Sequence, residues 1–115
     1  MDPDVYSASC PSRGVLYLVA STWTALIVGS IADGPLRFGE LQRMIDGIST
    51  KMLTQKLRAL ERDGILTRTV YAEVPPRTDY RLTELGRSLV APMKAVRDWS
   101  EASADAVEEA RTAAT

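Results

Sequence analysis

Residues 47–64 constrain the fold most, because they predict a helix with both ends marked. Ser49 is a favourable N-cap, since its hydroxyl can accept a hydrogen bond from an amide of the first turn. Gly64 can adopt the left-handed conformation that ends a helix. One side of this helix is apolar at helical spacing and is expected to pack on a core. It carries Ile48, Leu53, Leu57 and Leu60.

The opposite side of the helix is polar and lacks a carboxylate. It carries Lys51, Thr54, Gln55, Arg58 and Arg62, with Thr50 at its margin. Side chains of these types can contact phosphates and base edges in a DNA major groove. Taken alone, the pattern is better explained by an ordinary solvated face of an amphipathic helix. The flanking segments favour the DNA interpretation.

The segment before this helix predicts a helix-turn-helix. Residues 39–45 are expected to form a short helix with Leu41, Met44 and Ile45 on its inward side. Residues 46–48 then supply a tight turn. A short helix, a turn containing glycine and a second helix with a polar outer side are typical of this motif. Its second helix enters the major groove.

The segment after the helix predicts a β-hairpin that would serve as a wing. Residues 65–71 are rich in β-branched and aromatic residues, and residues 79–82 are expected to form the returning strand. Residues 72–78 form the loop, because its two prolines cannot join a ladder. Arg77 is expected beside these prolines at the tip, in reach of a phosphate or the minor groove. A solvated loop arginine is the alternative.

The other segments complete a mainly α fold with a small β-hairpin (α+β). A first helix is expected over residues 13–20, capped by Ser12, and a second over residues 23–32. Residues 36–38 allow only a single rung of sheet. We divide the chain into an N-terminal arm (1–12), a winged helix-turn-helix domain (13–82), a C-terminal dimerisation helix (83–111) and a tail (112–115).

The last helix is expected to begin after Thr83, which can cap it, and to kink about one turn before Pro92. An apolar stripe runs along it through Leu85, Leu89, Met93, Val96 and Trp99. A core of about 70 residues is too small to cover the whole stripe. The stripe therefore predicts a dimer, and a helix folded back on its own domain is the alternative.

Charge is distributed unevenly along the chain. The formal net charge is −1, but residues 37–81 hold nine basic and six acidic side chains, and the remainder holds five and nine. This division suits a basic face on an acidic body. The acidic N-terminus does not resemble a secretory signal, and no apolar run reaches the roughly 18 residues of a membrane span. We expect a cytoplasmic protein with no membrane partner.

The residue inventory argues against an enzyme. The chain has no histidine and a single cysteine, Cys10. Histidine-based triads, cysteine-based zinc sites and an internal disulfide are thereby excluded. The sequence also lacks a phosphate-binding glycine loop and a carboxylate pair in apolar surroundings. We assign no catalytic residue, no metal ligand and no cofactor.

Several blocks of residues, in order, resemble the HxlR family of bacterial winged-helix regulators. They are Cys10–Pro11, Trp23–Thr24 and residues 33–41, 47–58, 60–64, 71–80 and 82–86. The chain departs from the family at Thr22, where a basic residue is usual, and at Gly29–Ser30, where Arg-Glu is frequent. These departures lie outside the DNA-facing helix and bear on effector or dimer contacts.

The resemblance implies a homodimer paired through the first and last helices, with recognition helix and wing on DNA. Members of this family repress or activate genes, some in response to quinones, aldehydes or oxidants. In those members a cysteine at the position of Cys10 is the sensor. The expected interface residues are Val15, Leu16, Met93, Val96 and Trp99.

We therefore predict a dimeric, sequence-specific DNA-binding transcriptional regulator, a repressor, on a pseudo-palindromic operator. The alternatives are a winged-helix module for protein–protein contact and a ligand-responsive regulator without thiol sensing. Steep loss of affinity with salt would distinguish a DNA binder from a protein-binding module. The expected DNA contacts are Ser49, Thr50, Lys51, Thr54, Gln55, Arg58 and Arg77.

Cys10 is the candidate for sensing an oxidant or another small-molecule effector. It lies just before the first helix, where the helix N-terminus favours a thiolate and Arg13 adds a cation. Both effects predict a lowered pKa and selective oxidation. An inert cysteine, or one buried against the partner subunit, is the alternative.

Overall fold

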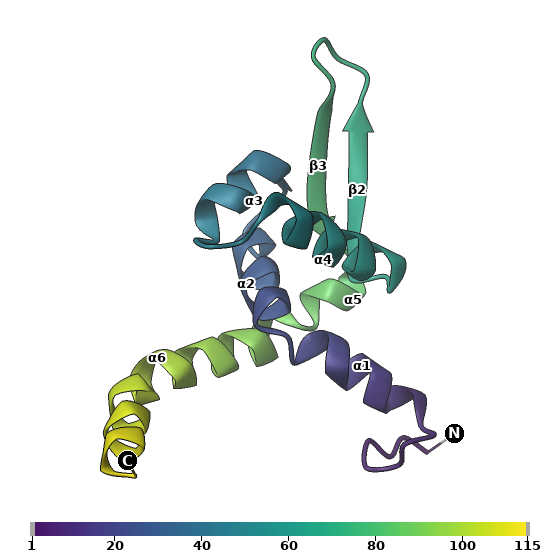
Figure 1. Cartoon of the computed structure of the whole chain (residues 1–115). Coiled ribbons are helices and arrows are strands. Elements are labelled where there is room, and N and C mark those ends of the chain that lie inside the picture. Colours follow the sequence, from purple (N-terminus) through teal and green to yellow (C-terminus); the bar gives the residue numbers. More distant parts are fainter. Residues whose placement is uncertain (1, 115) are drawn as a thin grey trace.

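The computed structural model describes residues 2–114 (Figure 1). Residues 1 and 115, which belong to the expected arm and tail, lie outside the described residues. The helices are α1 (Pro11–Val19), α2 (Thr22–Ile31), α3 (Phe38–Met44), α4 (Thr50–Arg62), α5 (Glu84–Arg87) and α6 (Val90–Ala113). The strands are β1 (Leu36–Arg37), β2 (Leu66–Tyr71) and β3 (Arg77–Leu82).

The strands form one antiparallel sheet in the order β1-β3-β2. Tyr80 of β3 lies opposite Leu36 on one side and Arg68 on the other. The two-residue β1 is the single rung that its length allows, and β2 and β3 form the predicted hairpin. The mainly α fold with a small β-hairpin is confirmed.

The core lies where α2, α3 and α4 meet the base of the sheet. The predicted apolar side of α4 faces it, since Leu53, Leu57 and Leu60 are each at most 2% exposed. Ile27 and Leu41, from α2 and α3, are completely buried beside them. This packing leaves the opposite side of α4 on the surface.

The start of the first helix differs from the sequence prediction. The first helix begins at Pro11 with Cys10 as its N-cap residue, not at residue 13 after Ser12. Proline is favoured in the first turn, because its missing N–H has no intrahelical partner there and its φ is already helical. The expected arm is therefore shorter than 12 residues.

The last helix is divided, and the prediction of one helix from Thr83 onward is wrong. Thr83 does cap α5, since its Oγ1 accepts a hydrogen bond from the amide of Gly86 at 3.0 Å. The chain then leaves the helix at Ser88–Leu89 and resumes as α6. Pro92 has no N–H for the carbonyl of Ser88, which makes this the point where a continuous helix breaks.

The helices α1 and α6 extend from the body in different directions, away from the hairpin (Figure 1). The chain measures 56 × 39 × 24 Å along its principal axes. No single helix within residues 2–114 has the length and apolar character to cross a membrane. Only α1 and α2 taken together would reach that length, and they are bent by 70°.

Candidate nucleic-acid interface

Helix α4, the second helix of the helix-turn-helix, starts and ends at the predicted residues. The hydroxyl of Ser49 accepts a hydrogen bond from the amide of Met52 at 3.0 Å. Gly64 has a φ of +78°, the left-handed conformation that favours glycine. The Nε2 of Gln42 donates to Thr50 Oγ1 at 3.0 Å, which ties α3 to the first turn of α4. These contacts fix the N-terminal half of the helix against its scaffold.

The outer face of α4 presents unengaged polar side chains. Lys51, Gln55 and Arg58 are exposed, and Thr54 is half-buried next to them. Within residues 2–114, no ion pair or hydrogen bond involves the side chain of Lys51, Gln55 or Arg58. Their donors are thus available to an external partner without first breaking an internal contact. The prediction that these residues share one outer face is confirmed.

The wing extends well beyond the body of the protein (Figure 1). Its loop, between Tyr71 and Arg77, carries Val74, Pro75 and Pro76, all exposed. The wing stands beside α4, so that helix and hairpin project from the same body.

Arg77 lies next to the loop of the wing, as predicted, but its guanidinium is held by neighbouring side chains. Arg77 is the first residue of β3 and pairs with Tyr71 across the hairpin. Its guanidinium lies 4.0 Å from the centre of the Tyr71 ring, and 3.7 and 3.6 Å separate its nitrogens from carboxylate oxygens of Glu73 and Asp79. Cation–π attraction and two carboxylates hold the side chain back along the strand.

The two side chains of Arg68 and Tyr80 also border α4, and the sequence analysis did not single them out. They face each other across β2 and β3, and Arg68 Nε lies 3.7 Å from Glu61 Oε2 on α4. Their shared location depends on the register of the hairpin, which the loop length and the burial of one face set together. Alternation along the two strands is the only signal that could have suggested it.

The sulfur of Cys10 lies in a polar environment at the start of α1. Cys10 Sγ accepts a hydrogen bond from the amide of Asp4 at 3.4 Å and lies 3.1 Å from Ser12 Oγ. The pKa of Cys10 is lowered, first by the Ser12 hydroxyl and then by the backbone amides of Asp4 and Ser12. The predicted direction is confirmed.

The expected cation beside Cys10 is engaged elsewhere. Arg13 donates instead to the backbone carbonyls of Val5 (3.1 Å) and Tyr6 (2.7 Å). It thereby folds the N-terminal arm back against α1. The lowered pKa of Cys10 comes from hydrogen bonds rather than from this guanidinium.

The expected interface residues divide into two groups. Val15, Leu16, Val96 and Trp99 are exposed on α1 and α6, with Trp99 at 65%. Met93 is only 7% exposed, because its own domain buries it. Met93 is therefore largely covered within the subunit itself, since the start of α6 packs on α2.

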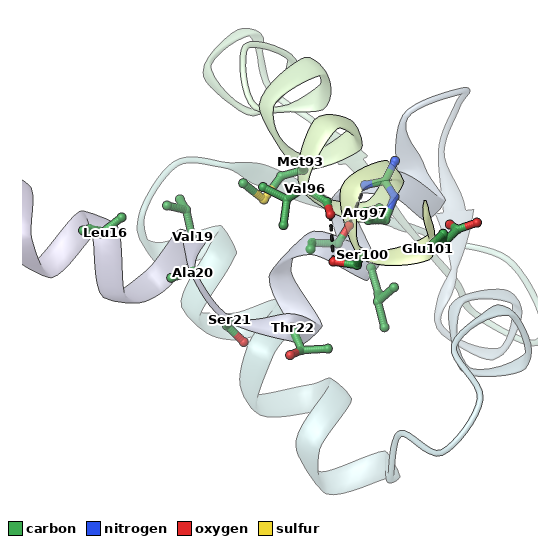
Figure 2. Close-up of a pocket in the computed structure, with 12 residues that line it drawn as sticks. Leu16, Val19, Ala20, Ser21, Thr22, Met93, Val96, Arg97, Ser100 and Glu101 are labelled. Carbon is green, nitrogen blue, oxygen red and sulfur yellow. Dashed lines mark hydrogen bonds between the residues drawn. The ribbon is translucent and has the colours of Figure 1, made fainter. Parts of the chain in front are cut away.

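An open apolar groove of about 500 Å³ lies between α1, α2 and α6. Leu16, Val19 and Ala20 line one side, and Met93 and Val96 line the other (Figure 2). Arg97 closes one end, where its Nη1 donates to the carbonyl of Ala25 at 2.9 Å. The exposed apolar surfaces of α1 and α6 thus continue into one concave surface.

A helix-turn-helix whose second helix is exposed and followed by a β-hairpin defines the winged helix-turn-helix class. Within that class, the chain belongs to the HxlR-like helix-turn-helix family, whose model matches residues 18–108. The resemblance drawn from the sequence is confirmed.

The similar proteins are named as transcriptional regulators. The uncharacterized HTH-type transcriptional regulator YtfH of Escherichia coli (strain K12) is 45% identical over 98 residues, 85% of this chain and 78% of that protein. The solved structure of ytfH from Salmonella typhimurium is 41% identical, with a TM-score of 0.89 over 96% of this chain and 99% of the other. The redox regulator HypR in its oxidized form is 39% identical, with a TM-score of 0.75 over 81% and 96%. The chain is thus a transcriptional regulator of this family and not an enzyme.

Proposed function

We propose that the protein is a dimeric, sequence-specific DNA-binding transcriptional regulator that acts as a repressor. The observation that carries this proposal is the outer face of α4, where three exposed polar side chains have no intramolecular partner within residues 2–114. Charged groups on a surface helix can pair with opposite charges three or four residues away, and neither Lys51 nor Arg58 does so within residues 2–114. Hydrogen-bond donors without an internal partner, on a helix beside a projecting hairpin, are suited to contact base edges and phosphates in the major groove.

In this proposal α4 enters the major groove by its N-terminal half. Ser49 and Thr50 lie at the groove edge, near the DNA backbone, and Lys51, Thr54, Gln55 and Arg58 face the bases and flanking phosphates. Arg77 acts mainly by bracing the wing, because Glu73, Asp79 and Tyr71 already hold its guanidinium.

The direct test is selection of bound sites from random duplex DNA, with and without an oxidant. A pseudo-palindromic consensus that binds at least about a thousandfold more tightly than random DNA would support the proposal. Affinity should also fall steeply with salt as bound phosphates release counterions. No enrichment of any sequence, together with salt-independent binding to another protein, would support the protein–protein module instead.

Dimerisation gives the next prediction. Trp99→Ala is expected to raise the dimer dissociation constant about thirtyfold, because an exposed tryptophan on an apolar surface has the character of an interface anchor. Sedimentation equilibrium measures this change, and Val74→Ala on the wing is the matched control, since Val74 is also an exposed apolar residue. A wild-type protein that is monomeric at micromolar concentration would contradict the dimer.

The dimer proposal also sets the operator geometry. Two recognition helices related by a twofold axis require half-sites about 34–36 Å apart, one helical turn of DNA. Footprinting of the selected site measures this spacing.

Cys10 gives a prediction about the effector. We propose that an oxidant or quinone modifies Cys10 and thereby changes DNA affinity, since its lowered pKa increases the thiolate fraction near neutral pH. The redox regulator HypR is similar in structure, and this similarity supports the proposal. The sulfur also accepts a hydrogen bond from the amide of Asp4, so modification of the sulfur would disturb the arm next to α1.

The measurement is operator binding by wild type and Cys10→Ser, before and after a quinone or hypochlorite, with mass spectrometry of the Cys10 peptide. Wild type should be modified and change its affinity, and the variant should not respond. An equal response in both proteins would favour a ligand-responsive regulator without thiol sensing.

A further inference from the structure

A small polar crevice lies between α4 and the face of the hairpin that packs against it. Its volume is about 270 Å³, and its rim carries Thr54 and Arg58 from α4 and Arg68 and Tyr80 from the two strands. Arg68 and Tyr80 are direct cross-strand neighbours, so the register of the hairpin brings guanidinium and phenol to the same place. The crevice shares Thr54 and Arg58 with the outer face of α4.

The crevice has more positive than negative charge. Glu61 is the only carboxylate among its lining residues, and its Oε2 lies 3.7 Å from Arg68 Nε. That distance exceeds hydrogen-bonding range, and both side chains are more than one third exposed, so the ion pair is weak. Arg58 has no ion-pair partner within residues 2–114. The crevice therefore keeps an excess of positive charge, with Arg68 weakly paired and Arg58 without an ion-pair partner among the described residues.

The phenol of Tyr80 is suited to donate a hydrogen bond into this crevice. Burial raises the pKa of Tyr80, Arg68 and Arg58 act in the opposite direction, and Glu61 adds to the rise. Tyr80 therefore keeps its proton at neutral pH.

We propose that this crevice binds one backbone phosphodiester of DNA, with Arg58 and Arg68 as its cations and Tyr80 as a hydroxyl donor. The inference rests on the proposed DNA binding by α4. When a recognition helix occupies the major groove and the wing lies over the adjacent minor groove, one sugar-phosphate strand passes between them. The crevice is lined by α4 and by both strands of the wing, the elements that would straddle this strand.

Glu61 provides a decisive test, because a phosphate-binding crevice and a purely structural ion pair predict opposite changes in the DNA affinity of Glu61→Gln. If the crevice binds phosphate, Glu61→Gln removes a repulsive carboxylate and should strengthen binding to operator and random DNA by roughly threefold to tenfold. If the Glu61–Arg68 ion pair only holds the wing against α4, the same change should weaken binding, as Arg68→Gln does.

The experiment measures DNA affinity by fluorescence anisotropy over a range of salt concentrations. Arg68→Gln should weaken binding to operator and random DNA alike by roughly tenfold and reduce the salt slope by about one unit. Tyr80→Phe should weaken binding several-fold and leave the slope unchanged, because it removes a donor without removing charge. Arg87→Gln on α5 is the matched control, since Arg87 is also an exposed arginine but does not line the crevice.

Operator duplexes with single methylphosphonate linkages locate the phosphate. A methylphosphonate at one position in each half-site should weaken binding by wild type. The same linkage should have little effect on binding by Arg68→Gln. Thermal unfolding of every variant separates loss of contact from loss of fold.

Two results would overturn the inference: an unchanged salt slope for Arg68→Gln, or weakened binding by Glu61→Gln in a protein that remains folded. Wild type that binds no DNA would refute the proposed function and the crevice together. Wild type that binds its operator, with an unchanged slope for Arg68→Gln, would refute the crevice alone.

Discussion

Gly86→Ala is expected to destabilise the fold by about 3 kcal/mol or more. A Cβ atom at this position would lie 2.0 Å from the carbonyl oxygen of Ile65 and 3.1 Å from Leu82 Cδ2. The carbonyl cannot move away easily, because it accepts hydrogen bonds from the amide of Thr83 at 3.0 Å and from its hydroxyl at 3.1 Å. The clash therefore falls on the junction that joins β3 to α5.

Urea denaturation measures this change, and Gly14→Ala is the matched control. Gly14 lies inside α1, and an added Cβ there would meet no heavy atom within 4 Å. Because alanine favours a helix over glycine, the control should be neutral or more stable by up to about 1 kcal/mol. A free energy of unfolding for Gly86→Ala within 1 kcal/mol of wild type would show that the junction adapts, contrary to this account.

Gln55→Ala is expected to weaken operator binding by about 1–3 kcal/mol and to relax the preference at one base position. Gln55 is exposed at the centre of the outer face of α4, and no hydrogen bond within residues 2–114 engages its amide. A side-chain amide can make two hydrogen bonds to the edge of adenine, which the wrong base cannot match. Truncation should therefore spare binding to random DNA.

The measurement compares operator, operators substituted at single positions, and random DNA, for wild type and Gln55→Ala. Lys51→Ala serves as a comparison, because loss of a cation also lowers affinity for random DNA and reduces the salt slope. An equal loss on specific and random DNA would assign Gln55 to backbone contact rather than base reading.

Gln55 lies on a helix that the sequence predicts, whereas Gly86 matters through a contact between segments distant in sequence. The helix that carries Gln55 could be predicted with both ends, because its determinants are local. Ser49 caps its own first turn, Gly64 takes the conformation that ends it, and the apolar spacing sets which side is buried. The helix-turn-helix and the hairpin follow from the same kind of local signal, and the outer face of α4 could thus be named from the sequence.

Contacts between segments distant in sequence could not be predicted in this way. The register of the hairpin pairs Arg77 with Tyr71, whose ring holds the guanidinium, and it places Arg68 opposite Tyr80. The packing of α6 on α2 decides that Met93 is buried while Trp99 stays exposed. The approach of α5 to the carbonyl of Ile65, just before β2, makes Gly86 sterically essential.

The sequence by itself determined the elements, their caps and the side of α4 that faces outward, because those depend on neighbours within one or two turns. The tertiary structure alone decided which side chains share the crevice beside α4 and which arginine is held within the wing. Strand register and helix docking are settled by the burial of the whole core, so no local pattern encodes them.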